Sequence, residues 1–161
     1  MGAVDSPQPA RHASAMDQTH ATCVDIDGAG VLLRGPSGSG KSDLALRLID
    51  GGARLVADDC TRLTLADGRL IASAPPEIAG RMEVRGLGIM DFEKRAETPL
   101  RLVIDLVAPG AVERLPKSAT IEVFGVCLPL LRLTPFEASA PAKVRAAAKA
   151  AANGRWTKAT S

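Results

Sequence analysis

The sequence predicts a single α/β domain that contains a phosphate-binding P-loop and a mixed β-sheet. Residues 35–42 are GPSGSGKS, which fits the pattern G-x-x-x-x-G-K-[ST]. An apolar run, VLLR, precedes this loop, and KSDLALRLID, with leucines at helical spacing, follows it. Strand-like runs outnumber helical ones along the chain, and several are joined by hairpin signals. That pattern favours a mixed sheet over a purely parallel one.

Composition narrows the class of protein. The chain has 161 residues, of which 46% are hydrophobic and 24% charged, with a net charge of +2, as suits one globular domain. Basic and acidic residues are interspersed and aromatic residues make up 2%, so we expect no nucleic-acid partner. No apolar run has the length of a membrane helix, and we expect no membrane partner. Three widely spaced cysteines favour buried core residues in a reducing compartment, which predicts a cytoplasmic protein.

The first half of the chain predicts three strands and one helix. Residues 1–17 are polar and without periodicity, so we expect a disordered leader before one domain over 18–153. Two β-rich runs, HATCVDI and GVLLR, meet at an Asp-Gly pair (27–28) that is typical of a tight hairpin. The helix after the P-loop ends at a Gly-Gly pair (51–52), a common helix stop. ARLVADD then predicts a buried strand that ends in two carboxylates.

The second half predicts further strands and a closing helix. TRLTLADGRLIAS alternates around an Asp-Gly pair (67–68), which indicates a second hairpin. Residues 74–99 are rich in glycine and proline, and we expect little regular structure there beyond a short run at 82–85. LRLVIDLV is a continuous apolar strand, and ATIEVFGVCLPLLRL predicts two strands around Gly125. An Ala- and Lys-rich helix within 136–153 precedes a flexible tail over 154–161.

The residue types of the P-loop suit the binding of a nucleoside triphosphate. Glycines let the backbone curl so that successive N–H groups face a phosphate, and the helix N-terminus adds partial positive charge. The lysine of the motif reaches the β- and γ-phosphates, and the hydroxyl after it ligates Mg²⁺. The predicted nucleotide-binding residues are Gly35, Pro36, Ser37, Gly38, Ser39, Gly40, Lys41 and Ser42.

Carboxylates near the P-loop are candidates for the chemistry. Asp58 and Asp59 end the strand after the P-loop helix, beside the expected γ-phosphate, where one can hold Mg²⁺ and the other can take a proton from an attacking hydroxyl. An Asp pair at a strand end also serves as a turn or a helix cap. Glu83 and Arg85 share one face of an extended run, so they can reach a metal–phosphate centre or form a surface ion pair.

Together, these segments resemble the catalytic domain of the bacterial HPr kinase/phosphorylase family. The resemblance covers about residues 19–133 and rests on HATCVDIDGAGVLLRGPSGSGKSDLALRLIDGGARLVADD and on MEVRGLGIMD. VRGLGI after a glutamate is more specific to the family than the P-loop is. The resemblance implies an HPr kinase/phosphoenolpyruvate carboxykinase-like fold and a short form that is a P-loop kinase catalytic domain alone.

The resemblance also implies roles for single residues. His20 matches an active-site histidine of the family, and Lys41 matches its phosphate contact. Asp59 matches the proton acceptor for the seryl hydroxyl of the protein substrate. Arg114, in VERLP, matches more loosely an arginine that acts on the transferring phosphoryl group. The implied catalytic set is therefore His20, Lys41, Asp59 and Arg114.

The implied cofactors are ATP and Mg²⁺, with Ser42, Asp58 and Glu83 as the metal set. The expected reaction moves the γ-phosphoryl group of ATP to a serine of a small HPr-like phosphocarrier protein of a bacterial phosphotransferase system. A homo-oligomer, a hexamer by resemblance, is expected to carry it out. A basic loop near VRPGRN serves phosphorolysis in the family, whereas this chain has LRLTPFEASAP, so we expect phosphorolysis to be weak or lost.

Two other functions are compatible with the P-loop. A P-loop kinase for a small molecule explains the loop and the Asp pair but not EVRGLGI, and it usually carries an arginine-rich lid. A catalytically inactive nucleotide-sensing regulator is the second alternative. The presence of Lys41, Ser42, Asp59 and Glu83 disfavours it.

Overall fold

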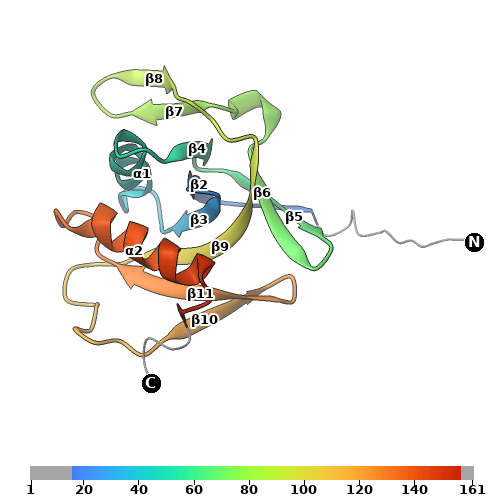
Figure 1. The fold of residues 1–161 in the computed structure, drawn as a ribbon. Helices are drawn as coiled ribbons and strands as arrows, with labels where there is room; N and C mark the ends of the chain where they lie inside the picture. Colours follow the sequence, from blue (N-terminus) through green and yellow to red (C-terminus); the bar gives the residue numbers. More distant parts are fainter. Residues whose placement is uncertain (1–15, 157–161) are drawn as a thin grey trace, which may run out of the picture.

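The computed structural model describes residues 16–156 and has a mixed sheet with both of its α-helices on one face (Figure 1). Over these residues a nine-stranded sheet has the order β1-β5-β6-β9-β3-β2-β4, and β11 pairs with β9 and β10. Its strands are β1 (Asp17–Thr19), β2 (Ala21–Ile26), β3 (Ala29–Arg34), β4 (Arg54–Ala57), β5 (Thr61–Ala66), β6 (Arg69–Ser73), β9 (Glu97–Leu106), β10 (Ala119–Val123) and β11 (Val126–Leu133). The strands β7 (Arg81–Val84) and β8 (Gly88–Asp91) form a separate hairpin. The α-helices are α1 (Lys41–Asp50) and α2 (Ala140–Ala152), and Pro76–Ile78 form a 3₁₀ turn.

The two predicted hairpins are confirmed, and so are the two strands predicted around Gly125. β2 pairs antiparallel with β3, β5 with β6, and β10 with β11. In each turn both central residues have positive φ, at 27–28, 67–68 and 124–125. Two-residue turns of this kind match the right-handed twist of the strands that they join. The two Asp-Gly signals therefore located the β2–β3 and β5–β6 turns correctly.

Strand β9 connects the two halves of the sheet. Its residues 97–99 pair antiparallel with β6, and residues 103–106 pair parallel with β11. Along its other edge, residues 100–105 pair parallel with β3. Since β4 and β3 are both antiparallel to β2, the strands β3, β4, β9 and β11 all run in the same direction. Their carboxyl ends meet at one edge of the sheet, where α/β proteins place their ligands.

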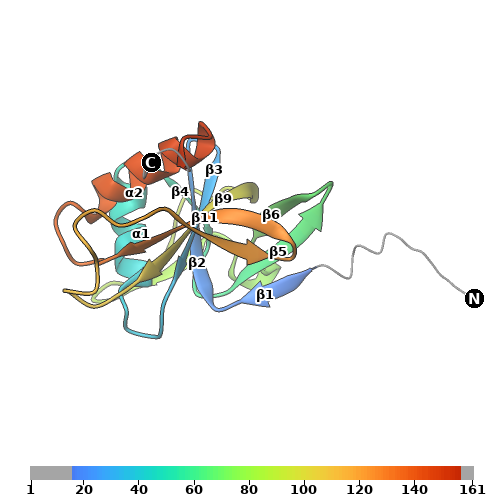
Figure 2. The ribbon, with the colours of Figure 1, turned by 90° about the horizontal axis from the view of Figure 1, so that it is seen from below.

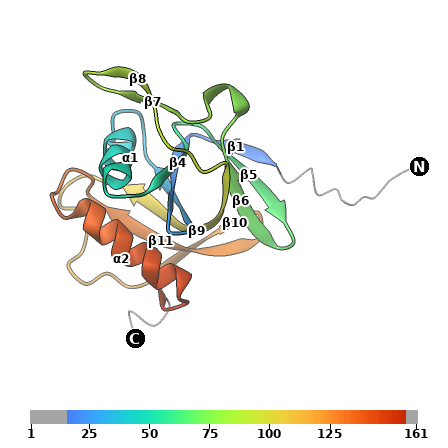
Figure 3. The ribbon, with the colours of Figure 1, turned by 45° about the horizontal axis from the view of Figure 1, so that its top comes forward.

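Alternation along the strands divides the core between the two faces of the sheet. Leu33 of β3 and Ile104 of β9 point to the face that α1 and α2 cover, where they pack with Leu44 and Leu48. Figures 2 and 3 show both helices on that side. The opposite face carries residues such as Val103 and packs against the curled β5–β6 arm. The predicted helix after the P-loop is thus confirmed, and burial of its leucines holds the P-loop against the sheet.

Three expectations about secondary structure and burial are corrected. Residues 88–91 form β8, which was not expected. All of its residues are exposed, so the sequence shows no apolar alternation there. Strand β1 begins at Asp17, inside the predicted leader, and pairs with β5; residues 1–15 of that leader lie outside the described residues. Cys23 is buried as expected, but Cys127 is exposed, since β11 turns its side chain outward there.

The segment predicted as a flexible tail begins with packed residues. Trp156 Nε1 donates a hydrogen bond to the Ala119 carbonyl at 3.0 Å, and Ser118 Oγ donates to the Trp156 carbonyl at 3.0 Å. The indole ring also packs against the apolar cluster under the helices. Residues 157–161 of the predicted tail lie outside the described residues. No helix in the described part of the chain is long and apolar enough to cross a membrane.

Candidate active site

The P-loop connects the carboxyl end of β3 to the first turn of α1, and its shape depends on two glycines. Gly40 has a φ of +104°, and a Cβ there would lie 2.9 Å from Phe136 Cζ and 3.1 Å from Pro135 Cγ. A Cβ at Gly35 would collide with Ser39 Oγ. Both positions therefore require glycine. A backbone that curls tightly around a ligand needs residues without a Cβ.

Lys41 lies buried at the base of the P-loop. Its side chain is 5% exposed, and its ammonium donates hydrogen bonds to the carbonyls of Gly35 at 2.7 Å and Pro36 at 3.1 Å. Lys41 Nζ also lies 3.9 Å from Asp59 Oδ1. Charge-assisted bonds of this kind fix the lysine within the loop. A cation is therefore held next to the loop backbone and close to a carboxylate.

Asp58 is hydrogen-bonded to the last residue of the P-loop motif. Ser42 Oγ donates to Asp58 Oδ1 at 2.7 Å, and Thr22 Oγ1 donates to the same oxygen at 3.1 Å. Burial raises the pKa of Asp58 above its usual value; these two hydrogen bonds oppose the rise, and the neighbouring charge of Asp59 adds to it. Asp58 is thus a partly buried carboxylate that two hydroxyl donors hold in place.

Asp59 faces solvent beside this pair. It has a φ of +64°, and its backbone N–H donates to Thr22 Oγ1 at 3.0 Å. Asp59 Oδ1 lies 3.4 Å from His20 Nε2, and the two side chains are 58% and 55% exposed. The left-handed backbone, which costs free energy outside glycine, turns Asp59 away from Asp58. One carboxylate is enclosed and its neighbour is open to an incoming substrate.

Thr22 was missed by the sequence reasoning. It is fully buried in β2, and its hydroxyl bonds to both neighbouring aspartates, donating to Asp58 and accepting from the Asp59 backbone. The only signal in the sequence is a threonine within a mostly apolar strand. That signal is weak, because the partner residues directly follow β4 and the β2–β4 pairing is not visible in the sequence.

The P-loop and the Asp pair open into one cleft of about 730 Å³. Residues of α1, the β7–β8 hairpin and the segment after β11 also line it, among them Leu46, Glu83, Arg85 and Phe136. The structure therefore brings together the predicted P-loop, Asp58, Asp59 and Glu83, and it joins His20 to them through Asp59. Arg114 is exposed in the 107–118 connection and is not among the residues that line the cleft.

The donor groups in this cleft fit a magnesium–nucleotide ligand. Ser42 Oγ and Asp58 Oδ1 are hard oxygen donors of the type that Mg²⁺ prefers, and Glu83 lines the cleft with them. Ser39 Oγ is buried in the P-loop without a hydrogen-bond partner among the described residues. Within the same residues, no three His, Cys, Asp or Glu side chains gather into a metal site by themselves. The oxygen donors of the cleft therefore suit a Mg²⁺ ion that takes some of its ligands from the protein and others from a bound phosphate.

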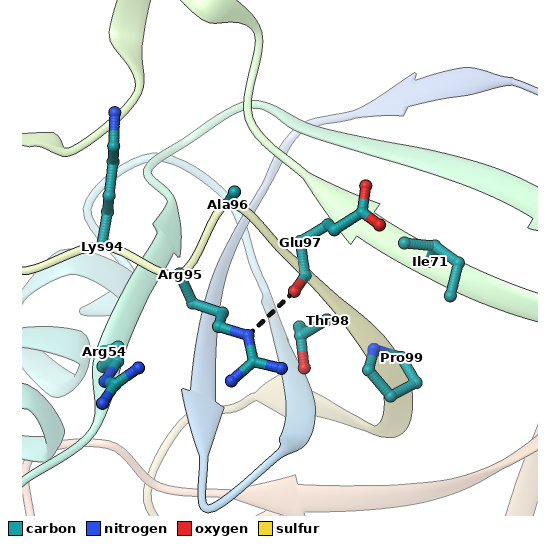
Figure 4. Close-up of a pocket in the computed structure, with 8 residues that line it drawn as sticks. All are labelled: Arg54, Ile71, Lys94, Arg95, Ala96, Glu97, Thr98 and Pro99. Carbon is teal, nitrogen blue, oxygen red and sulfur yellow. Dashed lines mark hydrogen bonds between the residues drawn. The ribbon is translucent and has the colours of Figure 1, made fainter.

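A second hollow, of about 510 Å³, lies where β9 begins (Figure 4). Arg54, Lys94 and Arg95 line it, and Arg95 Nε donates to the Glu97 carbonyl at 3.2 Å. The Glu97 carboxylate points away from that arginine in Figure 4. This hollow is basic, but no P-loop or hydrogen-bonded carboxylate pair opens into it. The cleft at the P-loop is therefore the candidate active site.

Comparison with known proteins agrees with this geometry. Residues 11–153 match the model of the HPr Serine kinase C-terminal domain family. The chain belongs to this family. It is 51% identical over 96 residues to the HPr kinase/phosphorylase of Clostridium tetani and 40% identical over 126 residues to that of Burkholderia lata. These matches cover 60% and 71% of this chain but 31% and 38% of the relatives, so the chain spans about a third of their length.

The fold agrees with a solved structure of the HPr kinase family. The Hpr(Ser) kinase/phosphatase from Coxiella burnetii matches with a TM-score of 0.73 and 31% identity, over 86% of this chain and 90% of that one. The predicted α/β fold, with the mixed sheet of the HPr kinase type, is confirmed. The resemblance seen in the P-loop and VRGLGI segments identified the family correctly.

Proposed function

We propose that this chain is an ATP-dependent protein serine kinase that uses Mg²⁺ and phosphorylates a small HPr-like phosphocarrier protein. The observation that carries the proposal is the cleft in which Lys41, the Ser42–Asp58 pair and the open carboxylate of Asp59 meet. The names of the relatives, HPr kinase/phosphorylase, support the choice of substrate.

The enclosed and open residues of the cleft take different roles in this reaction. Lys41 and the P-loop backbone bind the phosphates and neutralise charge on the transferring group. Ser42, Asp58 and Glu83 hold Mg²⁺, which when bound neutralises charge on the β- and γ-oxygens. These residues position the donor.

Asp59 is the proton acceptor in this proposal. Its exposed carboxylate receives the proton of the seryl hydroxyl as that oxygen attacks the γ-phosphorus of ATP and ADP leaves. His20, with Nε2 3.4 Å from Asp59 Oδ1, orients the carboxylate. A residue that takes a proton from a protein substrate must be accessible from solvent. Asp59, unlike Asp58, meets that requirement.

We further propose that the reverse reaction is weak or lost. In phosphorolysis an oxygen of inorganic phosphate attacks phosphoserine, pyrophosphate forms, and the serine oxygen regains a proton from Asp59. The family's basic loop for this step corresponds to LRLTPFEASAP (131–141) here, in which Arg132 lies earlier and the two loop arginines are missing. Fewer cations in this stretch leave less positive charge to attract an incoming phosphate.

The remaining parts of the proposal follow the family. Residues 18–153 act as the catalytic domain, as a homo-oligomer and in the cytoplasm, where ATP and the carrier are present. Arg114 joins the site by acting on the transferring phosphoryl group. It is exposed in the 107–118 connection.

The test is intact-mass analysis of a purified HPr-like carrier after incubation with the protein, ATP and Mg²⁺. We expect one added phosphoryl group with the wild type and none with Asp59→Asn, whose amide cannot accept the proton. Asp67→Asn is the matched control, because Asp67 also has a positive φ but lies in the β5–β6 turn away from the cleft. It should phosphorylate the carrier normally. No added mass with ATP still bound would favour a small-molecule kinase or a regulator.

Phosphorolysis is tested in the same assay. Phosphorylated carrier is incubated with the protein and inorganic phosphate, and a full-length HPr kinase/phosphorylase serves as the positive control. We expect the phosphoryl mass to persist with this chain and to disappear with the control. Rapid loss of the phosphoryl group with both enzymes would contradict the proposed defect while leaving the kinase assignment intact.

A further inference from the structure

We propose that Phe136 is the base-binding residue of the cleft: its ring stacks on the base of the bound nucleoside triphosphate. This contact makes a nucleoside triphosphate, rather than an inorganic polyphosphate, the preferred phosphoryl donor. The proposal rests on the proposed function for the identity of the donor, and it adds a residue that determines donor specificity.

Phe136 is an exposed aromatic ring beside the phosphate loop. Its side chain is 66% exposed and lines the same cleft as the P-loop and the Asp pair. One edge of the ring packs on Gly40, where an added Cβ would lie 2.9 Å from Cζ and 3.1 Å from Cε1. Because contact is made at the ring edge and most of the ring is exposed, a face of the ring is free to stack. Aromatic residues make up 2% of this chain, which makes a ring at this place informative.

The segment that carries Phe136 is held in place by hydrogen bonds from both helices. Arg47 of α1 donates from Nη2 to the Pro135 carbonyl and from Nη1 to the Glu137 carbonyl, the latter at 3.3 Å. Lys143 of α2 donates to the Glu137 carboxylate at 3.0 Å. These bonds fix the backbone on both sides of Phe136. A ring held in position loses little entropy when it stacks on a ligand.

The order of the strands places Phe136 at the opposite end of the site from the reacting groups. The P-loop follows β3, the Asp pair follows β4, and Phe136 follows β11, all at the carboxyl edge of the sheet. In the order β4-β2-β3-β9-β11 the Asp pair lies on one side of the P-loop and Phe136 on the other. A triphosphate with its γ-group near Asp59 therefore directs its nucleoside towards Phe136. Leu46 of α1 adds apolar surface to the cleft.

The experiment compares two donors that differ in the presence of a base. Isothermal titration calorimetry in Mg²⁺ buffer measures the binding of ATP and of inorganic tripolyphosphate to the wild type, Phe136→Ala and Phe136→Trp. Stacking on an aromatic side chain predicts that Phe136→Ala weakens ATP binding about 10- to 100-fold. Tripolyphosphate binding should stay unchanged, and Phe136→Trp should retain ATP binding. Phe124→Ala, at an exposed ring on the β10–β11 turn, is the matched control and should leave both affinities unchanged.

Three results would overturn the inference. Equal loss of ATP and tripolyphosphate binding in Phe136→Ala would assign the ring to support of Gly40 and the P-loop. Unchanged ATP binding with a raised KM for the carrier would make Phe136 a docking residue for the protein substrate. Failure of the wild type to bind ATP would remove the site itself. Base-dependent binding without phosphorylation of any carrier would instead leave this inference standing and reject the proposed kinase function.

Discussion

The two walls of the cleft differ in how many of their side chains are held by contacts within the protein. The P-loop wall, residues 35–42 with Asp58, is held by hydrogen bonds from Lys41 and Ser42. The hairpin wall, residues 81–91, points charged and apolar side chains to solvent, with Leu87 69% and Ile89 73% exposed. The first wall is organised before any ligand arrives, and the second, apart from the Arg81–Asp91 ion pair, leaves apolar and charged side chains exposed to a ligand or a partner.

The contrast has a physical cause in the sheet. The residues of the P-loop wall directly follow β3 and β4, which are largely buried strands of the large sheet. The hairpin wall is a two-stranded sheet, which is marginal by itself and needs packing against another element. Met82 and Val84 supply that packing by pointing into the core, so Glu83 and Arg85 point outward. Alternation along β7 therefore directs the predicted metal ligand into the cleft.

The largest effect is expected from Lys41→Ala, on the organised wall. The variant loses the buried ammonium that faces the phosphates, and we expect the rate of carrier phosphorylation to fall about 10²- to 10³-fold. The measurement is single-turnover transfer from radiolabelled ATP. Lys94→Ala, which removes a cation from the second hollow, is the control and should keep the wild-type rate. A fall of less than about tenfold would mean that the loop amides bind the phosphates without the lysine.

Glu83→Gln tests the hairpin wall and is expected to have the next largest effect. Loss of one carboxylate ligand should raise the Mg²⁺ concentration for half-maximal activity about tenfold or more. The rate at saturating Mg²⁺ should recover most of its wild-type value. Glu122→Gln, at an exposed position on β10, is the control. An unchanged Mg²⁺ requirement in Glu83→Gln would remove this residue from the metal set.

The organised wall was also the part that the sequence predicted well. The P-loop, the helix after it and the Asp-Gly hairpins are local signals, because a few neighbouring residues decide the backbone conformation. Thr22 could not be predicted in its role, since its contacts with Asp58 and Asp59 depend on the pairing of β2 with β4.

The hairpin wall and the ends of the chain were less predictable. Strand β8 has no buried residue and thus no apolar alternation, so its pairing with β7 leaves no mark on the sequence. Trp156 lies among polar residues in the sequence, and its packing is visible only through tertiary contacts such as the hydrogen bond to the Ala119 carbonyl. The roles of Glu83 and Arg114 rest on family resemblance, because spacing alone does not separate an active-site charge from a surface charge.

Asp58→Asn is expected to have a smaller effect, on stability in metal-free buffer. Burial raises the pKa of Asp58 in the folded protein, so the folded state binds more protons than the unfolded chain above the ordinary Asp pKa. The Asp58 contribution to the free energy of unfolding therefore falls as pH rises through the raised pKa of the folded state. The amide does not titrate and its oxygen can still accept from Ser42. From about pH 4 to pH 7, urea denaturation should show the wild type losing stability relative to Asp58→Asn. A relative gain would mean that the hydrogen bonds outweigh burial.

The smallest effect is expected from Arg114→Ala. Arg114 is exposed in the 107–118 connection, and an exposed charge contributes roughly 1 kcal/mol or less, so kcat should fall about two- to fivefold. Steady-state kinetics with the carrier measures it, and Lys117→Ala, in the same connection, is the control. An unchanged kcat would remove Arg114 from the site, and a loss as large as that of Lys41→Ala would mean that Arg114 acts on the phosphoryl group out of solvent when both substrates are bound. In that case the 107–118 connection would take up, on substrate binding, the fixed position that the P-loop wall has before any ligand arrives.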